Sequence, residues 1–321
     1  MNAPLLSIVI ANYNYGRFLE DAIQSVITQD MGDKIELIVC DAASVDNSVE
    51  IIQKYAKGLP PNTAYSDWCK LNSAQPSTYG SQLITWWCSE HDGGQSAAFN
   101  KGFSHARGKY LTWLNADDIF LPDALKKFEM ATARNPQVEW LGGGCFFLDP
   151  ELRIFKCARG RRISEYRRQN GLISVTGPSS FFSKELYQRV GQIDERFVYM
   201  MDIDLWARFA MLARVEYIPF AKYVWGLRLH NEAKMSGHKF TDDGKILEGK
   251  ASEAAYLKNK KRLMQIEKEK GWMREKVQRL TVSPSRMGMI LSADFVPAVM
   301  SRVDTWRMRG LKVNIIKETS K

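Results

Sequence analysis

The sequence lacks the cysteine spacing of a disulfide framework or a zinc site. Its 321 residues include five cysteines, an odd number, at positions 40, 69, 88, 145 and 157, and none forms a Cys-x-x-Cys pair. Reduced thiols fit this wide spacing better than crosslinks do. The cysteines therefore favour a cytoplasmic protein over a secreted one.

The sequence also lacks membrane signals. No basic region followed by a long apolar core opens the chain, and no uninterrupted apolar run approaches the ~18–20 residues that span a bilayer. We therefore expect neither a signal peptide nor a transmembrane helix. With 45% apolar and 25% charged residues, the chain can bury a sizeable core, and its composition excludes disorder throughout.

Excess positive charge is absent from the first three quarters of the chain. Residues 1–244 hold 27 basic and 28 acidic side chains, a balance of −1, whereas residues 245–321 hold 18 and 8, a balance of +10. All of the net charge of +9 therefore lies in the C-terminal extension, residues 245–321. This extension needs an explanation of its own.

Strand-like and helix-like segments alternate through the first 135 residues. Short β-branched apolar runs predict strands, and apolar residues at helical spacing predict the helices between them. The expected strands cover 5–11, 35–41, 83–90 and 109–118, and the expected helices cover 19–29, 44–56, 93–106 and 122–135. This order predicts a mostly parallel α/β sheet with flanking helices.

The second half is less regular. Residues 140–150 and 153–160 predict an antiparallel pair of strands, and residues 177–191 predict a strand that leads into a helix. A helix with two acids in its first turn is expected at 201–213. Two further strands are expected at 215–220 and 223–230.

Polar side chains stand at the C-terminal ends of the expected parallel strands. They are Asn12, Asp41, Asp92, Asp117 and Asp118. In open α/β sheets this edge is where ligands bind. The pattern therefore predicts a ligand site at the carboxyl edge.

Asp117 and Asp118 place two like charges at the end of an apolar strand. Adjacent carboxylates repel each other and lose hydration there unless a cation is present. Mg²⁺ or Mn²⁺ would suit them, and two carboxylates form an incomplete set that substrate phosphates and water would complete. A solvated acidic turn before a helix, with Asp123 favouring the helix N-terminus, explains the same residues.

Asp41, at the end of the second strand, could accept a hydrogen bond from a nucleobase imide. Asn12 and Asn14, after the first strand, could bind a ribose or a base. Turn and capping roles explain all three residues equally well.

Four segments together carry a family resemblance. They are SIVIANYNYGRFLEDAIQSVITQ (7–29), ELIVCDAASVDNS (36–48), SEHDGGQSAAFNKGFSHARGKYLTWLNADD (89–118) and FVYMMDIDLWARF (197–209). In order and spacing they resemble glycosyltransferase family 2, which has the GT-A fold. The resemblance implies a catalytic domain over residues 5–235, with a nucleotide-binding half at 5–120 and an acceptor-binding half at 121–235. It also implies inverting transfer from a nucleoside-diphosphate sugar.

The resemblance implies a role for each strand-end residue. Ala11 and Asn12 would line the nucleoside site, and Asp41 would bind the base. Asp92, Gly94 and Gln95 would lie along the ribose and the donor sugar. Asp118 would be the main metal ligand of a DxD-like pair, and Asp117 would face the ribose or the waters of the metal. Ala42 stands where the family usually has glycine, which puts the local turn in question.

The resemblance also implies a catalytic base. Inverting transfer by direct displacement needs one group to take the proton of the acceptor hydroxyl. Asp202 matches the family's base, although Met201 stands where an acid often precedes it. Asp204, two residues further along the expected helix, faces another side and is expected to be structural or to face the acceptor. Both acids could instead merely favour the helix N-terminus.

A later family element resembles RLHNEAKMS, residues 228–236. By this resemblance His230 would be a third metal ligand and Arg228 would contact phosphate. An ordinary polar histidine explains His230 as well. Residues 176–184 match the region near the acceptor entrance.

The C-terminal extension mixes basic with apolar residues, at 258–280 and 287–313. Such a segment, if helical, could lie on an anionic membrane surface. Packing on the catalytic domain or an oligomer contact would also explain it. Nucleic-acid binding is not expected, because no recognised module accompanies the charge.

The resemblance, together with the carboxylate pair, implies a glycosyltransferase that depends on Mn²⁺ or Mg²⁺ and uses a nucleotide sugar, most simply a UDP-sugar. A glycan or lipid-linked acceptor of bacterial surface polysaccharide synthesis is expected, at the inner face of the cytoplasmic membrane. A nucleotidyltransferase is the rival enzyme, although residues 11–18 lack its glycine-rich phosphate loop. A non-catalytic membrane-binding or partner-binding protein is the third alternative.

Overall fold

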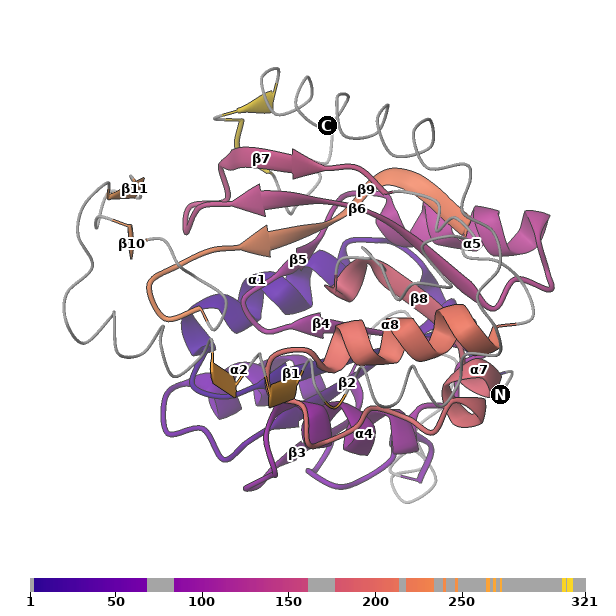
Figure 1. The fold of residues 1–321 in the computed structure, drawn as a ribbon. Coiled ribbons are helices and arrows are strands. Elements are labelled where there is room, and N and C mark those ends of the chain that lie inside the picture. The colour runs from indigo at the N-terminus through magenta and orange to yellow at the C-terminus, as the bar shows by residue number, and fades with distance from the viewer. Residues whose placement is uncertain are drawn as a thin grey trace, which may run out of the picture.

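The computed structural model describes residues 3–67, 84–160, 177–213 and 218–233. It also describes short stretches further on, at 239–240, 246–247, 264–265, 268–269, 272, 308–309 and 311–313. The main sheet has nine strands in the order β3-β2-β1-β4-β8-β6-β9-β5, with β7 paired to β6 beside this path. Helices cover both of its faces (Figure 1). The predicted α/β sheet with flanking helices is confirmed.

The first half contains four parallel strands, each followed by a helix. The strands are β1 (Leu6–Asn12), β2 (Ile35–Asp41), β3 (Ile84–Ser89) and β4 (Tyr110–Asn115). The helices are α1 (Gly16–Ile27), α2 (Ser48–Ala56), α4 (Gln95–His105) and α5 (Ala124–Arg134), with a 3-10 turn η1 at Gly32–Lys34. These bounds agree with the predicted elements within a few residues.

The second half adds strands of mixed direction and uneven length. They are β5 (Ile119–Phe120), β6 (Trp140–Leu148), β7 (Ile154–Ala158), β8 (Ser180–Ser183) and β9 (Ile218–Arg228). The accompanying helices are η3 (Gly177–Ser179), α7 (Lys184–Arg189) and α8 (Met201–Leu212), and a separate ribbon pairs β10 (Lys239–Phe240) with β11 (Ile246–Leu247). The antiparallel pair β6–β7 is as predicted.

The strands predicted at 215–220 and 223–230 form a single strand, β9. Ala221, between the two predicted strands, pairs with Gly143 of β6, so the ladder continues through a register shift. Sequence periodicity did not predict one continuous strand, because the strand continues through an irregularity in its pairing with β6. Residues 215–217 of the predicted pair lie outside the described residues.

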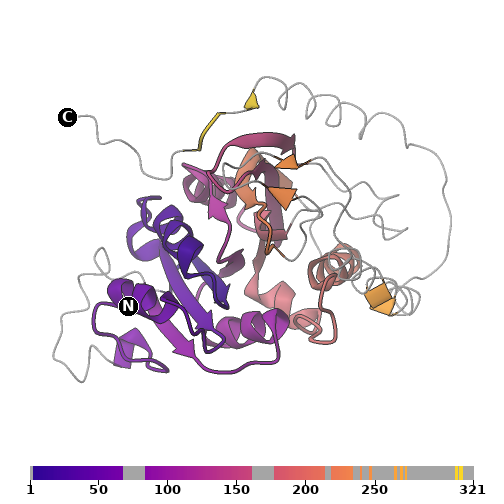
Figure 2. The same cartoon turned by 90° about the vertical axis from the view of Figure 1, so that its left-hand side faces the viewer.

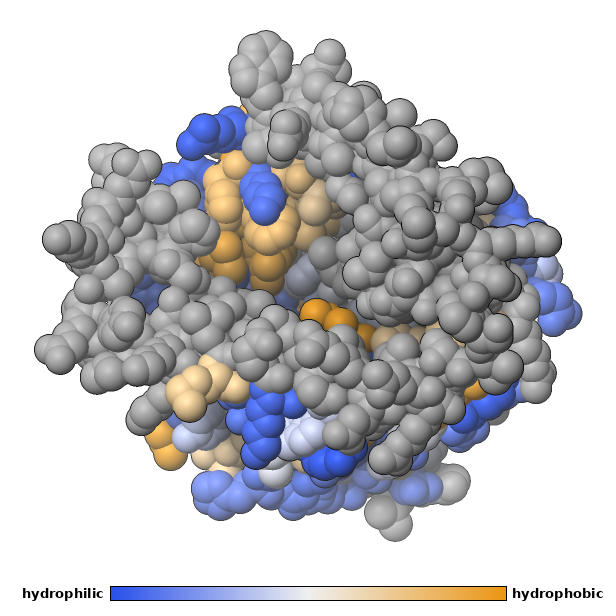
Figure 3. Space-filling model, viewed as in Figure 1, coloured by the Kyte–Doolittle hydropathy of each residue, from blue (hydrophilic) through white to orange (hydrophobic). Residues whose placement is uncertain are grey.

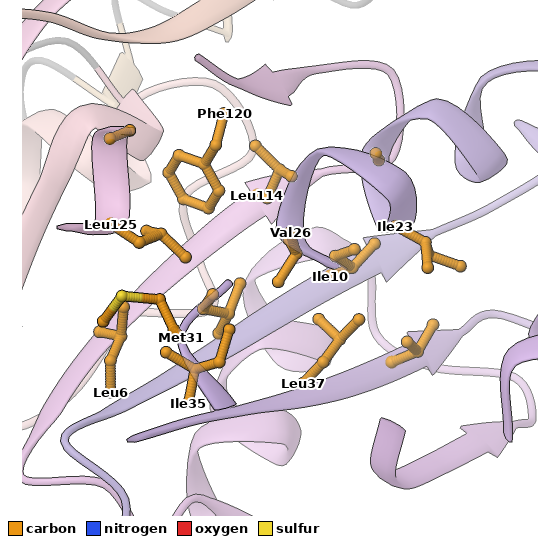
Figure 4. Packing of buried hydrophobic residues seen from close by; sticks show 14 of the residues in the cluster. Leu6, Ile10, Ile23, Val26, Met31, Ile35, Leu37, Leu114, Phe120 and Leu125 are labelled. Atoms are coloured by element: carbon orange, nitrogen blue, oxygen red, sulfur yellow. The ribbon is translucent and has the colours of Figure 1, made fainter. Parts of the chain in front are cut away.

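Two apolar cores sandwich the sheet. On one face α1, α2 and α5 bury side chains against Ile8 and Ile10 of β1, and Figure 4 shows Ile23 and Val26 of α1 facing the strands. On the other face α4, α7 and α8 pack against Val9. The alternation along β1 follows from the two-residue period of a strand and explains why residues on both of its faces are apolar.

The parallel register brings the polar strand ends to one edge. Asn12 pairs with Asp41, Ala11 with Asn115, and Asp41 with Ser89. Figure 2 shows the N-terminal strands side by side, with the second half of the chain against them. The polar groups that follow these strands in the sequence therefore lie side by side at one edge of the sheet.

The described residues of the C-terminal extension are partly helical and partly extended. Residues described between 264 and 272 are helical, but Ile246–Leu247 is a strand. The N–H of Ile154 donates to the carbonyl of Leu311 (2.8 Å), and the N–H of Val313 donates to that of Leu152 (2.9 Å). This part of the extension pairs with the chain at the start of β7. Apolar side chains reach the surface nearby, over β6 and β7 (Figure 3).

Candidate active site

Asp41 is the centre of a buried polar network at the end of β2. Its side chain is 1% exposed and accepts hydrogen bonds from Asn12 Nδ2 (2.6 Å) and Ser89 Oγ (2.6 Å). The N–H and the hydroxyl of Ser44 donate to the same carboxylate. Four donors therefore hold Asp41, and it in turn fixes the loop after β2 to the end of β1.

Asn12 keeps one polar atom without a partner in this network. The residue is 4% exposed, and its Oδ1 has no hydrogen-bond partner, whereas Nδ2 is bound by Asp41 and Ser44. An unpaired buried acceptor is unfavourable unless a ligand or water supplies a donor. Asn12 thus keeps a buried, unpaired acceptor at the edge where the sequence predicts a nucleoside.

The loop after β1 is shaped by Asn14, which has a left-handed backbone with φ 55°. Its N–H donates to Ser44 Oγ (2.8 Å), and its Oδ1 accepts from the N–H of Val45 (2.9 Å). Tyr13, before it, is 60% exposed, so an aromatic ring stands in solvent beside this network.

The Ala42 departure from the family pattern has a structural explanation. The left-handed conformation after β2 falls on Ala43, with φ 54°, and not on Ala42. The Ala42 N–H donates to the carbonyl of Asn12 (2.9 Å). Alanine at position 42 therefore fits this loop without a glycine.

The two neighbouring carboxylates after β4 have different surroundings. Asp118 is 0% exposed, and its carboxylate accepts from the N–H of Arg228 (3.0 Å) and from Asn115 Nδ2 (2.7 Å). Burial raises the pKa of the Asp118 carboxyl well above its usual value, and the nearby charge of Asp117 raises it further. Asp118 thus binds β9 to the end of β4 in the protein interior.

Asp117 faces His230 instead. Its Oδ2 lies 3.1 Å from Nε2 of His230, and the two side chains are 13% and 3% exposed. The imidazole packs against the rings of Phe18 and Tyr15, and Arg17 lies 3.4 Å from its other nitrogen. The structure therefore brings together one carboxylate and one imidazole from segments 113 residues apart.

The chemistry of this pair fits a divalent metal. Carboxylate oxygen and imidazole nitrogen are both ligands of Mn²⁺, and an adjacent buried carboxylate adds negative charge that a cation would offset. Among the described residues, no three acidic, histidine or cysteine side chains are arranged to hold an ion. The predicted trio of Asp117, Asp118 and His230 is thus not assembled. The Asp118 carboxylate instead accepts from the N–H of Arg228 in β9.

Arg228 lies beside this pair, but its guanidinium is already engaged. Nη2 donates to Asp21 of α1 (2.8 Å), and the group lies 4.8 Å from the centre of the Phe18 ring. Its Nε is buried without a partner. A phosphate contact by Arg228 through Nη2, as predicted from the sequence, would compete with Asp21.

The start of α4 connects the carboxylates to the other wall of the site. Gln95 Nε2 donates to Asn115 Oδ1 (2.9 Å), whose amide nitrogen in turn binds Asp118. The next residue, Ser96, donates to the carbonyl of Phe197 (2.9 Å) and lies 3.1 Å from the sulfur of Met201. The turn before the helix has Gly94 at φ 105° and its N–H bound to Asp92 Oδ1 (2.7 Å).

Asp202, the second residue of α8, lies on this second wall. Its Oδ1 accepts from the N–H of Ile203 (2.8 Å), and its Oδ2 lies close to Gly177, where a Cβ would be 3.9 Å away. The same Cβ would be 3.4 Å from the Trp225 ring of β9. Gly177 therefore lies between Asp202 and Trp225 of β9. Trp225 precedes Arg228 by three residues in the same strand.

Asp204, unlike Asp202, forms a buried ion pair with Arg208. It is 1% exposed and forms two contacts to Arg208, at 2.7 and 3.0 Å, while Arg208 also donates to the carbonyl of Val190. This buried ion pair within α8 gives Asp204 a structural role.

Replacing Asp204 with alanine should lower the stability of the fold strongly. Removing one member leaves the Arg208 charge buried and unpaired, which typically costs about 3–5 kcal/mol. Thermal unfolding should show a large drop in Tm. Lys34→Ala, which removes a solvent-exposed ion pair with Glu129, is the control and should leave Tm nearly unchanged. An equal Tm for both variants would contradict the structural role.

Several site residues were not identified from the sequence. Ser44, Ser89 and Asn115 complete the networks of Asp41 and Asp118, and Tyr13 and Tyr15 add rings to the edge. Their positions directly after strands were a usable signal. Serine and asparagine are, however, so common in turns that the pattern did not separate them.

Comparison with known proteins identifies the family of this chain. The family model described as glycosyl transferase family 2 matches residues 7–191. An uncharacterized glycosyltransferase from Methanocaldococcus jannaschii is 27% identical over 214 residues, which cover 65% of this chain and 65% of that protein, just under two thirds. Another, from Mycobacterium tuberculosis, is 27% identical over 213 residues, covering 66% and 71%.

The fold is shared with a solved structure, a mannosyltransferase from Pyrobaculum calidifontis in complex with GDP-Man and Mn²⁺. It aligns with a TM-score of 0.51 at 16% identity, over 95% of this chain and 70% of that one. At this identity the likeness shows the fold, which is GT-A. Because the family model matches more than half of the sequence, this chain belongs to glycosyltransferase family 2.

Proposed function

We propose that this protein is an inverting, divalent-metal-dependent glycosyltransferase that takes its sugar from a nucleoside-diphosphate sugar. One observation carries the proposal: the Asp117–His230 pair, the Asp41 network and the start of α8 are joined along one edge of the sheet. In this proposal, the same edge would hold the nucleoside, the diphosphate and the base.

The nucleoside would bind at the ends of β1 and β2. Asn12 Oδ1 is a free acceptor for the imide N–H of a uracil, and Tyr13 offers an exposed ring for stacking. Asp41 supports this site by holding Asn12 and Ser44, with Ala11 and Asn14 beside it. These features favour a UDP-sugar. Asp92, Gly94 and Gln95 would then lie along the ribose and the sugar.

Asp117 and His230 would hold the divalent metal, Mn²⁺ or Mg²⁺, and Asp118 would hold the turn that carries Asp117. The metal supplies positive charge for the departing diphosphate. The presence of Mn²⁺ and GDP-Man in the mannosyltransferase of the same fold supports this assignment. Because Asp118 is buried and bonded to β9, we assign the main ligand to Asp117, which reverses the expectation from the sequence.

Asp202 would act as the base. It takes the proton of the acceptor hydroxyl as that oxygen forms a bond to the anomeric carbon. The bond from the anomeric carbon to the diphosphate oxygen breaks, and its electron pair leaves with the nucleoside diphosphate. Attack from the opposite side inverts the configuration.

The acceptor would be a glycan or lipid-linked oligosaccharide of a bacterial surface polysaccharide. The basic extension supports docking at an anionic membrane, at the inner face of the cytoplasmic membrane. In the described part of the chain, no helix has the length and apolar character to cross a bilayer. Liposome sedimentation tests the docking: binding should require anionic lipid and weaken with salt.

A donor screen tests the proposed activity. With Mn²⁺ present, a UDP-sugar at about 100 times its Kd should stabilise the protein by about 2.7 kcal/mol, and a chelator should remove the effect. Slow hydrolysis should release free sugar and nucleoside diphosphate. Release of pyrophosphate would instead identify a nucleotidyltransferase, and neither product nor stabilisation would identify a non-catalytic protein.

A further inference from the structure

A buried carboxylate from the C-terminal extension reaches the start of α8. Glu269 is 0% exposed, and its Oε1 accepts from the N–H of Val198 (2.9 Å). Its Oε2 accepts from the N–H groups of Tyr199 (3.0 Å) and Met200 (2.9 Å). Three successive backbone donors thus converge on one side chain that lies 69 to 71 residues further along the chain.

These donors belong to the turn that leads into α8. N–H groups before a helix have no partner within the helix, and the helix dipole places positive potential there. Successive N–H groups in a turn form a concave anion site, which a carboxylate fills well. Gln265, one helical turn before Glu269, donates to the same carboxylate (2.9 Å). Glu269 is therefore fully bonded although it is buried.

An aromatic contact fixes the same segment beside this turn. The ring centre of Trp272 lies 5.7 Å from that of Phe197, edge to face, and the Arg196 guanidinium lies 5.6 Å from the Trp272 ring. Gln265, Glu269 and Trp272 are spaced by four and three residues, so they share one helical face. The contact with the turn before α8 therefore uses one face of this helical segment.

The turn is held from its other side by α4. Ser96 donates to the carbonyl of Phe197 and contacts the sulfur of Met201, while Glu269 binds the N–H groups between these two residues. Figure 1 shows α4 and α8 near one another, and both belong to the same apolar core. Residues 197–201 are thus clamped directly before Asp202.

We propose that Glu269 is a positioning residue that fixes the orientation of Asp202, so that the extension is part of the catalytic unit. The proposal rests on the proposed role of Asp202 as base. Without the carboxylate, three N–H groups lose their acceptor, and the turn that orients Asp202 relaxes. A displacement of about 1 Å at a reacting group can lower a rate about 100-fold.

Glu269→Gln in the full chain is the primary test. Glutamine keeps the size of the side chain, but its –NH₂ group cannot accept a hydrogen bond, so at least one of the three N–H groups loses its acceptor. We expect kcat for sugar transfer to fall about 10- to 100-fold. The donor Kd in the presence of Mn²⁺ should stay unchanged, because the nucleoside and metal sites lie on β1, β2 and β4.

Two controls separate positioning from general destabilisation. Met264→Ala changes a side chain of the same segment that is 66% exposed, and Ile52→Val weakens the core remote from the site. At temperatures below their Tm, both variants should keep the wild-type kcat. If Ile52→Val, at a similar loss of Tm, lowered kcat as much as Glu269→Gln, the positioning role would be wrong.

A double-mutant cycle distinguishes this proposal from the function on which it rests. In the Asp202→Asn background, Glu269→Gln should slow transfer no further, since the group it positions is gone. Multiplicative losses would overturn the positioning role. Full turnover by Asp202→Asn alone would overturn the base assignment instead. If Glu269→Gln does not fold, Glu269→Asp, which keeps the charge but shortens the side chain, carries the same expectations.

Discussion

Asp202→Asn should lower kcat for sugar transfer about 10²–10⁴-fold, the usual contribution of a general base. Asparagine keeps the shape and the hydrogen bond to the N–H of Ile203, but it cannot take the proton of the acceptor hydroxyl. The donor should bind with an unchanged Kd, because Asp202 lies on α8 and not at the ends of β1, β2 or β4. Single-turnover transfer and isothermal titration measure the two quantities separately.

The contrast with Asp204 makes this result specific. Both acids lie in the first turn of α8, but Asp204 is bound to Arg208 and should affect stability. We expect Asp202→Asn to keep its Tm and lose activity. Near-normal transfer by this variant would show that another group takes the proton.

Asp117→Ala should abolish the effect of Mn²⁺ on donor binding. Loss of residues that only orient a ligand lowers metal affinity about 10–100-fold, so loss of a direct ligand should cost at least as much. Titration of a UDP-sugar with and without Mn²⁺ should give the same weak affinity for the variant. His230→Ala should show the same loss, because it faces the same carboxylate.

Asp118→Ala is the matched comparison, and it should mainly lower the stability of the fold. The variant leaves the Arg228 N–H and the Asn115 amide without their acceptor, at about 1–3 kcal/mol for each buried group. Its Tm should therefore fall, whereas that of Asp117→Ala should not. If Asp118→Ala kept its Tm and alone lost the metal effect, the main ligand would be Asp118.

The sequence predicted the first half of the fold well because its signals are local. The apolar runs of β1 and β2 and the helical spacing of α1 each specify one element, and strand–helix alternation specifies a parallel sheet. The second half depends on pairing. The single strand β9 results from the pairing of Ala221 with Gly143, which no periodicity within β9 indicates.

The candidate site was predictable to the extent that it follows from strand ends. Parallel strands end at one edge, so Asn12 and Asp41 were expected to meet, and they do. Which of Asp117 and Asp118 is buried depends on β9, more than 100 residues away. Glu269 gave no signal, because a glutamate in a basic, helical segment resembles any solvated charge.

A crystal structure with a UDP-sugar and Mn²⁺ would test the central claim most directly. The account predicts an anomalous manganese peak bonded to Asp117 and His230, the diphosphate beside it, and uracil within hydrogen-bond distance of Asn12 Oδ1. A manganese peak elsewhere, or a nucleotide bound away from the ends of β1 and β4, would contradict it.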